Sequence, residues 1–183
     1  MLERLLEGSI DLIYFESKLH VDERGYFCER FNKYIFSEFV GADFELFQSN
    51  ESCSKKNVLR GLHYQTDKPQ GKLATVLKGA ALDVVVDLRT NSKTFGQWFS
   101  IILDSSKKNS LWIPRGYAHG FLSLTDEMVF SYMVDNSYDP ASEQTLVWND
   151  EYLQIDWDIE EPIISSKDSK GLPFDQAKKF DNL

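Results

Sequence analysis

The sequence predicts a single all-β domain whose short strands close into a barrel. Between residues 44 and 148, short apolar runs recur at intervals of roughly ten residues, and Gly, Asn, Asp or Ser separate one run from the next. The one helical pattern lies outside this region, and no strand–helix alternation typical of a parallel sheet appears. The 183 residues contain no repeat or linker, so we expect one domain over 1–183.

The individual elements follow in chain order. The N-terminal segments 10–15 and 25–31 are apolar enough to form strands, and residues 32–40 predict one short helix with Asn32 as its N-cap. Further strands are expected within 44–52, 58–65, 72–79, 81–89, 97–104, 110–116, 118–124, 128–134 and 144–148. From about residue 162 the chain is polar and contains proline, which predicts a tail that wraps the barrel surface.

The segment 81–89 favours a barrel with a polar interior over a dry sandwich. Strict alternation places Leu and Val side chains on one face, and Asp83 and Asp87 on the other. Two carboxylates are costly in a dry core, so we expect that face to line a polar cavity in which Asp83 has partners.

Composition argues against several classes of protein. Lys and Arg number 20 against 29 Asp and Glu, and the resulting net charge of −9 disfavours a broad basic face for nucleic acid or anionic lipid. No apolar run is long enough for a membrane span and no export signal is visible, so we expect a cytoplasmic protein. The two cysteines fit a reducing compartment.

Two of the three histidines lie among other chemically active residues. His63 follows Arg60 in V-L-R-G-L-H-Y-Q, and Lys72 begins the next strand. His119 ends a P-x-G-x-x-H string that matches the second short motif of the cupin barrels. Metal-binding cupins pair this string with an earlier H-x-H, but here that position reads H-Y-Q. Two distant histidines make a poor zinc or iron site, so we predict a cupin-like barrel without a catalytic metal.

Three more groups of polar residues are candidates for a ligand site. Arg24 lies beside a glycine and has a guanidinium suited to bidentate contact with phosphate. Lys167 and Asp168 belong to a tail segment that can close over a cavity mouth. Three neutral residues alternate along one strand and therefore share one face, as in a polar ligand wall: Gln48, Asn50 and Ser52. Each group alone also fits an ordinary solvated surface.

Together these strings resemble one known family. In order, the chain contains D-E-R-G-Y-F-x-E-x-F, Q-S-N-E-S, V-L-R-G-L-H-Y-Q, G-K-L, D-V-V-V-D-L-R, S-x-T-F-G-x-W, I-P-R-G-Y-A-H-G-F, Y-M-V-D-N-S-Y-D-P, W-N-D and S-x-K-D. From about residue 12 to 175 it resembles the dTDP-4-dehydrorhamnose 3,5-epimerase family, which has a cupin-type jelly-roll barrel. It departs from the family pattern at Ala74, Thr75, Met133 and Glu151, and these positions bear on fine specificity more than on the reaction class.

The resemblance implies cofactor-independent epimerisation of a dTDP-4-keto-6-deoxyhexose at C3, C5 or both, in deoxysugar biosynthesis. The C4 ketone acidifies the hydrogens on both neighbouring carbons, so a base can remove one and an acid can return a proton to the opposite face. The resemblance assigns the base to His63, oriented by Asp168, and the acid to Tyr132. Lys72 is implied to stabilise the oxyanion at O4, and Asp83 to hold Lys72 or His119.

The resemblance also implies ligand contacts and a partner. Matching positions for contacts to the diphosphate, the sugar or other ligand groups are Arg24, Glu29, Gln48, Asn50, Arg60, His119, Glu143 and Lys167, and Tyr138 matches the tyrosine that stacks on thymine. Strict alternation puts Arg60 and His63 on opposite faces, so either a bulge at Gly61 turns both inward or Arg60 lies outside the site. Family members are commonly homodimers that exchange N-terminal strands, which leaves open whether Arg24 and Glu29 act in cis.

Several alternatives remain at this point. A mono-epimerase would use the same base and acid, and a 3,4-ketoisomerase would use the same barrel. A non-catalytic sugar-nucleotide binding barrel would not need His63, Lys72, Tyr132 and Asp168 together. A metal-dependent cupin oxygenase would need a bound iron.

Overall fold

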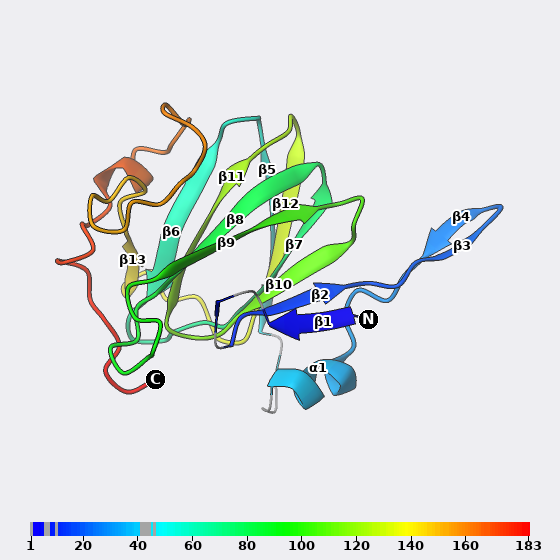
Figure 1. Cartoon of the computed structure of the whole chain (residues 1–183), viewed down its shortest axis with the longest axis horizontal. Coiled ribbons are helices and arrows are strands. Elements are labelled where there is room, and N and C mark those ends of the chain that lie inside the picture. Colours follow the sequence, from blue (N-terminus) through cyan, green and yellow to red (C-terminus); the bar gives the residue numbers. More distant parts are fainter. Residues whose placement is uncertain (1, 6–7, 10, 41–44, 46) are drawn as a thin grey trace.

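Two antiparallel sheets dominate the structure, a computed structural model that describes residues 2–5, 8–9, 11–40, 45 and 47–183 (Figure 1). The strands are β1 (Leu2–Leu5), β2 (Ile13–Glu16), β3 (His20–Asp22), β4 (Gly25–Phe27), β5 (Gln48–Ser54), β6 (Leu59–Gln65), β7 (Lys72–Lys78), β8 (Ala80–Asp87), β9 (Trp98–Asp104), β10 (Asn109–Ile113), β11 (Tyr117–Ser123), β12 (Met128–Val134) and β13 (Glu143–Thr145). Helix α1 spans Lys33–Val40, and a 3-10 helix, η1, spans Asp168–Lys170.

The two sheets face each other and form the barrel. One has the strand order β1-β2-β10-β7-β12-β5, and the other has the order β13-β6-β11-β8-β9. Strands β3 and β4 form a separate hairpin that extends away from the barrel (Figure 1). The predicted all-β fold is therefore confirmed.

Most predicted elements appear near their expected positions. The carboxamide oxygen of Asn32 accepts the N–H groups of Tyr34 at 3.1 Å and Ile35 at 3.5 Å, so it caps α1 as predicted. In the segment 25–31 only Gly25–Phe27 is a strand, and β1 and β3 were not predicted. Residues 10, 44 and 46 of the predicted strands lie outside the described part of the chain.

The described residues form three apolar clusters: one between the sheets, one on the outer face of the five-stranded sheet, and one where α1 packs on the six-stranded sheet. The inner core includes Val85, Leu111 and Phe130. The outer core forms where the C-terminal segment packs on β6, β8 and β11, and it includes buried Phe174 and Phe180. The tail runs over the outside of the barrel, and the apolar residues spread singly among its charged ones, such as Phe174 and Phe180, are buried in the outer core.

Alternation along β8 separates these two environments. Val84 and Val86 point into the outer core, whereas Val85 points into the barrel. Asp83 shares the inward face and is fully buried, and its Oδ2 lies 2.9 Å from Nε2 of His119. The sequence predicted that Asp83 faces a polar interior and has a partner there, and His119 is that partner.

A bulge in β6 resolves the question of Arg60 and His63. Arg60 pairs with Phe121 and His63 with His119, so β6 uses three residue steps where β11 uses two. Gly61 lies in the bulge with φ +111°, and a Cβ there would be 2.6 Å from Cα of a neighbouring glycine on β11. Because of the extra residue, Arg60 and His63 both line the same cavity.

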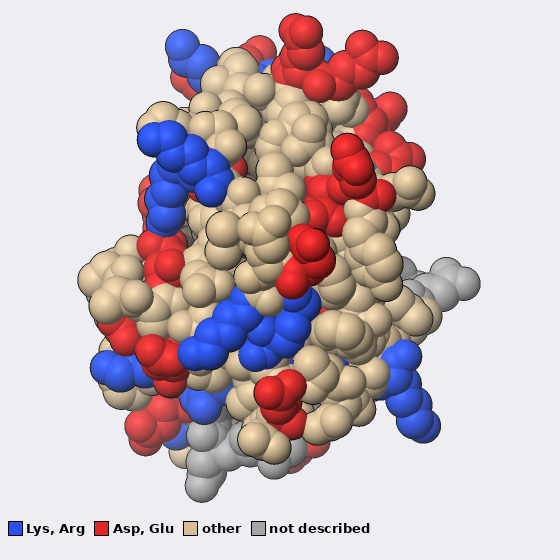
Figure 2. Space-filling model, turned by 90° about the vertical axis from the view of Figure 1, so that its left-hand side faces the viewer, with Lys and Arg blue, Asp and Glu red and all other residues tan. Residues whose placement is uncertain are grey.

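The described surface carries both signs of charge. Figure 2 shows one face, on which Lys and Arg side chains form small separate groups among Asp and Glu. Of the helices in the described ranges, none combines the length and apolar character needed to cross a membrane.

Candidate active site

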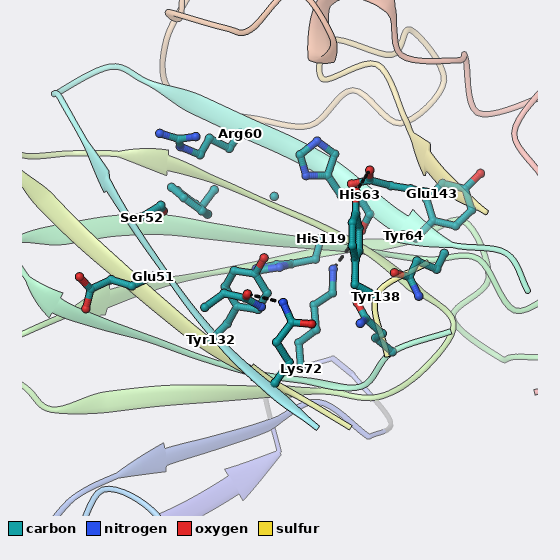
Figure 3. Close-up of a pocket in the computed structure, with 16 residues that line it drawn as sticks. Glu51, Ser52, Arg60, His63, Tyr64, Lys72, His119, Tyr132, Tyr138 and Glu143 are labelled. Atoms are coloured by element: carbon teal, nitrogen blue, oxygen red, sulfur yellow. Dashed lines mark hydrogen bonds between the residues drawn. The ribbon is translucent and has the colours of Figure 1, made fainter. Parts of the chain in front are cut away.

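A cavity of about 410 Å³ lies between the two sheets (Figure 3). Strands of both sheets contribute its walls, because inward-facing residues alternate along each strand. The polar and aromatic lining includes Gln48, Asn50, Ser52, Arg60, His63, Gln65, Lys72, His119, Tyr132, Tyr138 and Glu143. The cavity thus gathers side chains that are far apart in the chain, from Gln48 to Glu143.

At the cavity wall His63 contacts Asp168, where Nε2 and Oδ1 are 2.6 Å apart. Asp168 is buried at the start of η1, and its other oxygen accepts the N–H of Gly61 at 3.4 Å. Burial raises the pKa of Asp168. The hydrogen bond and charge of His63, together with the Gly61 N–H, lower it by more than burial raises it, so the pKa lies below the ordinary value of an aspartate. The ionised carboxylate accepts a hydrogen bond from Nε2–H, which leaves Nδ1 as the basic ring nitrogen.

Lys72 is buried at the first position of β7 and points into the cavity (Figure 3). Its Nζ donates to the carbonyl oxygen of His63 at 3.2 Å. Burial lowers the pKa of Lys72 to about 8, against the opposing charges of Glu143 and Asp83. An ammonium has three N–H donors, so this one can also bind an oxyanion in the cavity.

His119 forms a second imidazole–carboxylate pair. It is the cross-strand neighbour of His63, and its Nε2 contacts Asp83, so Asp83 holds this histidine rather than Lys72. Both residues of the pair are buried. The cavity therefore has two imidazoles on adjacent strands, each oriented by a buried carboxylate.

Tyr132 lies on the opposite wall from His63, because β12 and β6 belong to different sheets (Figure 3). Its ring is half-buried in the middle of β12. Burial and the charge of Glu143 raise the pKa of Tyr132, and Arg60 opposes them only in part. The hydroxyl therefore stays protonated at neutral pH and can donate a proton.

Glu143 connects two segments at the cavity mouth. Its Oε2 accepts the hydroxyl of Tyr138 at 2.8 Å and lies 2.5 Å from Nζ of Lys167. Burial raises the pKa of Glu143, but these two partners lower it below its ordinary value, so the carboxylate is ionised. Lys167 immediately precedes Asp168, so the mouth and the His63 contact are connected through the tail.

Comparison with known proteins identifies the family. The family model for dTDP-4-dehydrorhamnose 3,5-epimerase matches residues 9–176. A dTDP-4-dehydrorhamnose 3,5-epimerase from Shigella flexneri is 44% identical over 171 residues, which are 93% of this chain and 94% of that protein. The chain belongs to the dTDP-4-dehydrorhamnose 3,5-epimerase family.

Solved structures of related epimerases share the fold. The Legionella pneumophila dTDP-6-deoxy-D-glucose-3,5-epimerase, in complex with dTDP-4-keto-L-rhamnose, has a TM-score of 0.93 at 38% identity and covers 98% of this chain and 97% of its own. A 3′-monoepimerase from Streptomyces bikiniensis, in complex with dTDP-quinovose, has a TM-score of 0.88 at 33% identity and covers 94% and 88%. The cupin-like barrel is thereby confirmed, and it is shared by epimerases of both kinds.

Two residues predicted from the family pattern lie away from this chain's cavity. Arg24 is exposed at the turn of the β3–β4 hairpin, where it pairs with Asp22 at 2.6 Å. Glu29 is exposed and accepts the side-chain N–H of Asn32 at 3.1 Å. Arg60 does line the cavity, but its guanidinium donates to Ser54 Oγ at 3.1 Å on β5.

The sequence reasoning missed some of the cavity wall. Gln65 lines the cavity, and its position two residues after His63 on one strand was a usable signal for a shared face. Gln70 also lines it, from the loop before β7, and period-two reasoning gives no signal there. Across the described ranges, no three His, Cys, Asp or Glu side chains are grouped closely enough to hold a metal ion.

The buried ammonium of Lys72 predicts a pH-dependent stability. Its folded pKa of about 8 is below the ordinary lysine value of 10.5, so between these values the unfolded chain binds more protons and stability rises with pH. From pH 8 to 10 the wild type should gain about 2 kcal/mol relative to Lys72→Met. Urea unfolding of both proteins at each pH measures this difference, and a constant difference would show that Lys72 titrates normally.

Proposed function

We propose that this chain catalyses, without a cofactor, the epimerisation of a dTDP-4-keto-6-deoxyhexose at C3 and C5 in deoxysugar biosynthesis. The observation that carries the proposal is the His63–Asp168 pair, which faces the hydroxyl of Tyr132 across one cavity. The relatives support the substrate class, since the Shigella protein is named for this reaction and the Legionella structure contains dTDP-4-keto-L-rhamnose.

His63 is the base in this proposal. Its Nδ1 takes a proton from the carbon next to the ketone, so a C–H bond breaks, an N–H bond forms and the electron pair moves to O4. Asp168 keeps the Nε2 proton in place and stabilises the imidazolium that results. The dyad thus supplies both basicity and orientation.

Lys72 stabilises the enolate. The negative charge develops on O4, and a preorganised ammonium in a site shielded from water favours that charge over the neutral ketone. One such donor lowers the activation free energy by roughly 3 kcal/mol. Its bond to the carbonyl oxygen of His63 keeps the ammonium beside the base.

Tyr132 is the acid. Its raised pKa keeps the hydroxyl protonated, and its place on the opposite sheet lets it donate to the face of the ring that His63 does not reach. An O–H bond breaks and a C–H bond forms on the far face, which inverts the carbon. His63 then exchanges its proton with solvent, and Tyr132 is reprotonated.

Epimerisation at one carbon only is the second candidate. The observation that favours it is the close structural likeness to the Streptomyces 3′-monoepimerase. The same base and acid serve either carbon, so the outcome depends on how the sugar ring is held. A 3,4-ketoisomerase and a non-catalytic binding barrel are less consistent with a base and an acid on opposite walls.

Hydrogen exchange with solvent tests the proposed reaction. In deuterium oxide, the wild type should introduce deuterium at C3 and C5 of dTDP-4-keto-6-deoxyglucose, and NMR resolves the two positions. His63→Ala should abolish exchange at both carbons because the base is lost. Exchange at one carbon alone would establish the mono-epimerase, and no exchange with the wild type would refute the epimerase proposal for this sugar.

Tyr132→Phe gives the matched contrast in the same experiment. The base is intact in this variant, so net epimerisation should slow more than exchange does. Equal losses in the two rates would contradict the role of Tyr132 as the acid.

We also infer that the functional form is a homodimer. The β3–β4 hairpin carries exposed Val21 (74%) and Phe27 (71%) and extends beyond the barrel, as a segment that contacts a second copy would (Figure 1). In this arrangement Arg24 and Glu29 complete the partner's cavity, where Arg24 binds the diphosphate. The ligand contacts within this chain are then Gln48, Asn50, Arg60, His119, Tyr138, Glu143 and Lys167.

The molecular mass in solution tests the dimer. Sedimentation equilibrium should give twice the chain mass of 21.2 kDa. Val21→Asp combined with Phe27→Asp should shift the protein to the monomer, since both charges would fall in the contact. A wild-type protein of single-chain mass would contradict the inference.

A further inference from the structure

Gln65 belongs to the cavity wall, yet both N–H donors of its amide bond to the protein itself. The side chain is 4% exposed. Its Nε2 donates to the carbonyl oxygens of Lys68 at 2.6 Å and Ser137 at 3.2 Å, and its Oε1 accepts the N–H of Asp139 at 3.0 Å. A carboxamide has two N–H donors, and both are occupied, so Gln65 has no donor left for a ligand.

Two of these bonds are made on either side of Tyr138. Ser137 precedes Tyr138 and Asp139 follows it, so a single amide holds the backbone before and after the ring. The third bond, to Lys68, ties the same amide to the loop between β6 and β7. One side chain at the end of β6 therefore connects two loops at the cavity.

Other contacts fix the ends of the segment that carries Tyr138. At its start, Asp135 accepts the N–H of Gly71 at 2.6 Å, and Gln70 donates to the carbonyl oxygen of Asn136 at 2.9 Å. At its end, the N–H of Thr66 donates to the carbonyl oxygen of Ser142 at 2.9 Å. Gln65 acts between these anchor points, where the ring of Tyr138 is 51% exposed and open to a flat ligand.

We propose that Gln65 is a positioning residue for nucleotide binding, which holds Tyr138 ready to stack on the base. The inference rests on the proposed function, from which it takes the stacking role of Tyr138. Ordering the segment before binding removes an entropic cost that the nucleotide would otherwise have to offset. Metal-binding cupins have a second histidine at the strand position of Gln65. In this chain the residue there instead holds the loop that carries Tyr138.

A purely structural role predicts a different energetic pattern. If Gln65 only stabilised the fold, its loss would weaken binding whether or not the Tyr138 ring were present. If it acts through Tyr138, its effect on binding should disappear once that ring is removed. A double-mutant cycle distinguishes the two cases, because only coupled residues deviate from additivity.

The experiment measures dTDP binding by isothermal titration calorimetry. Gln65→Ala should weaken dTDP binding about five-fold or more, as expected when a base loses an aromatic stacking partner. In a Tyr138→Ala background, adding Gln65→Ala should change the affinity by less than about two-fold. Full additivity of the two effects, or unchanged affinity in Gln65→Ala, would overturn the inference.

Gln144→Ala is the matched control. Gln144 is a half-buried glutamine on the neighbouring strand, and its Oε1 accepts the hydroxyl of Tyr64 at 2.7 Å and the N–H of Lys178 at 3.4 Å, away from the Tyr138 segment. Its loss should leave dTDP affinity unchanged. A similar loss of affinity in this control would identify general damage to the fold and overturn the positioning role.

Gln65→Glu covers the case in which Gln65→Ala does not fold. It keeps the size of the side chain and an acceptor for Asp139, but it places a carboxylate oxygen against the carbonyl oxygens of Lys68 and Ser137. The same coupled loss of dTDP affinity is expected. A wild type that does not bind dTDP would refute the proposed function and this inference together, whereas a wild type that binds with Gln65 variants unaffected would refute this inference alone.

Discussion

The hydrogen bond between His63 Nε2 and Asp168 Oδ1 determines what the rest of the cavity can do. The C-terminal segment that carries Asp168 packs its apolar side chains, Phe174 and Phe180 among them, on the outer face of the five-stranded sheet. That packing delivers a buried, ionised carboxylate to the back of the imidazole. The proposed base is therefore assembled from the barrel and its tail together, and neither part supplies it alone.

Inversion at a carbon requires an acid on the face of the sugar opposite the base, and the two facing sheets provide this arrangement. The base comes from β6 and the acid from β12, so the sugar ring is placed between groups that approach it from opposite sides. The bulge at Gly61 adjusts this geometry, because it turns Arg60 and His63 toward one cavity despite their odd spacing. Lys72 lies on the same sheet as the acid and bonds to the backbone of the base.

Local patterns in the sequence predicted which side chains of a single strand share a face. They failed where contacts between distant segments determine the structure. Period-two alternation was sufficient for β8 and for the polar wall of β5, since each is a property of one strand. The sequence left open whether Arg60 faces the cavity, because a bulge depends on the register with β11. The tail appeared polar because its buried phenylalanines are isolated, and the bonds of Gln65 to Ser137 and Asp139 join backbone groups more than 70 positions along the chain.

The tautomer of His63 tests the central claim most directly, and ¹⁵N NMR of the imidazole measures it. With the ring neutral, the account predicts a proton on Nε2 and a free lone pair on Nδ1, with Asp168→Asn changing that distribution. A proton found on Nδ1 in the wild type would contradict the account, because the nitrogen assigned as the base would be unable to accept one.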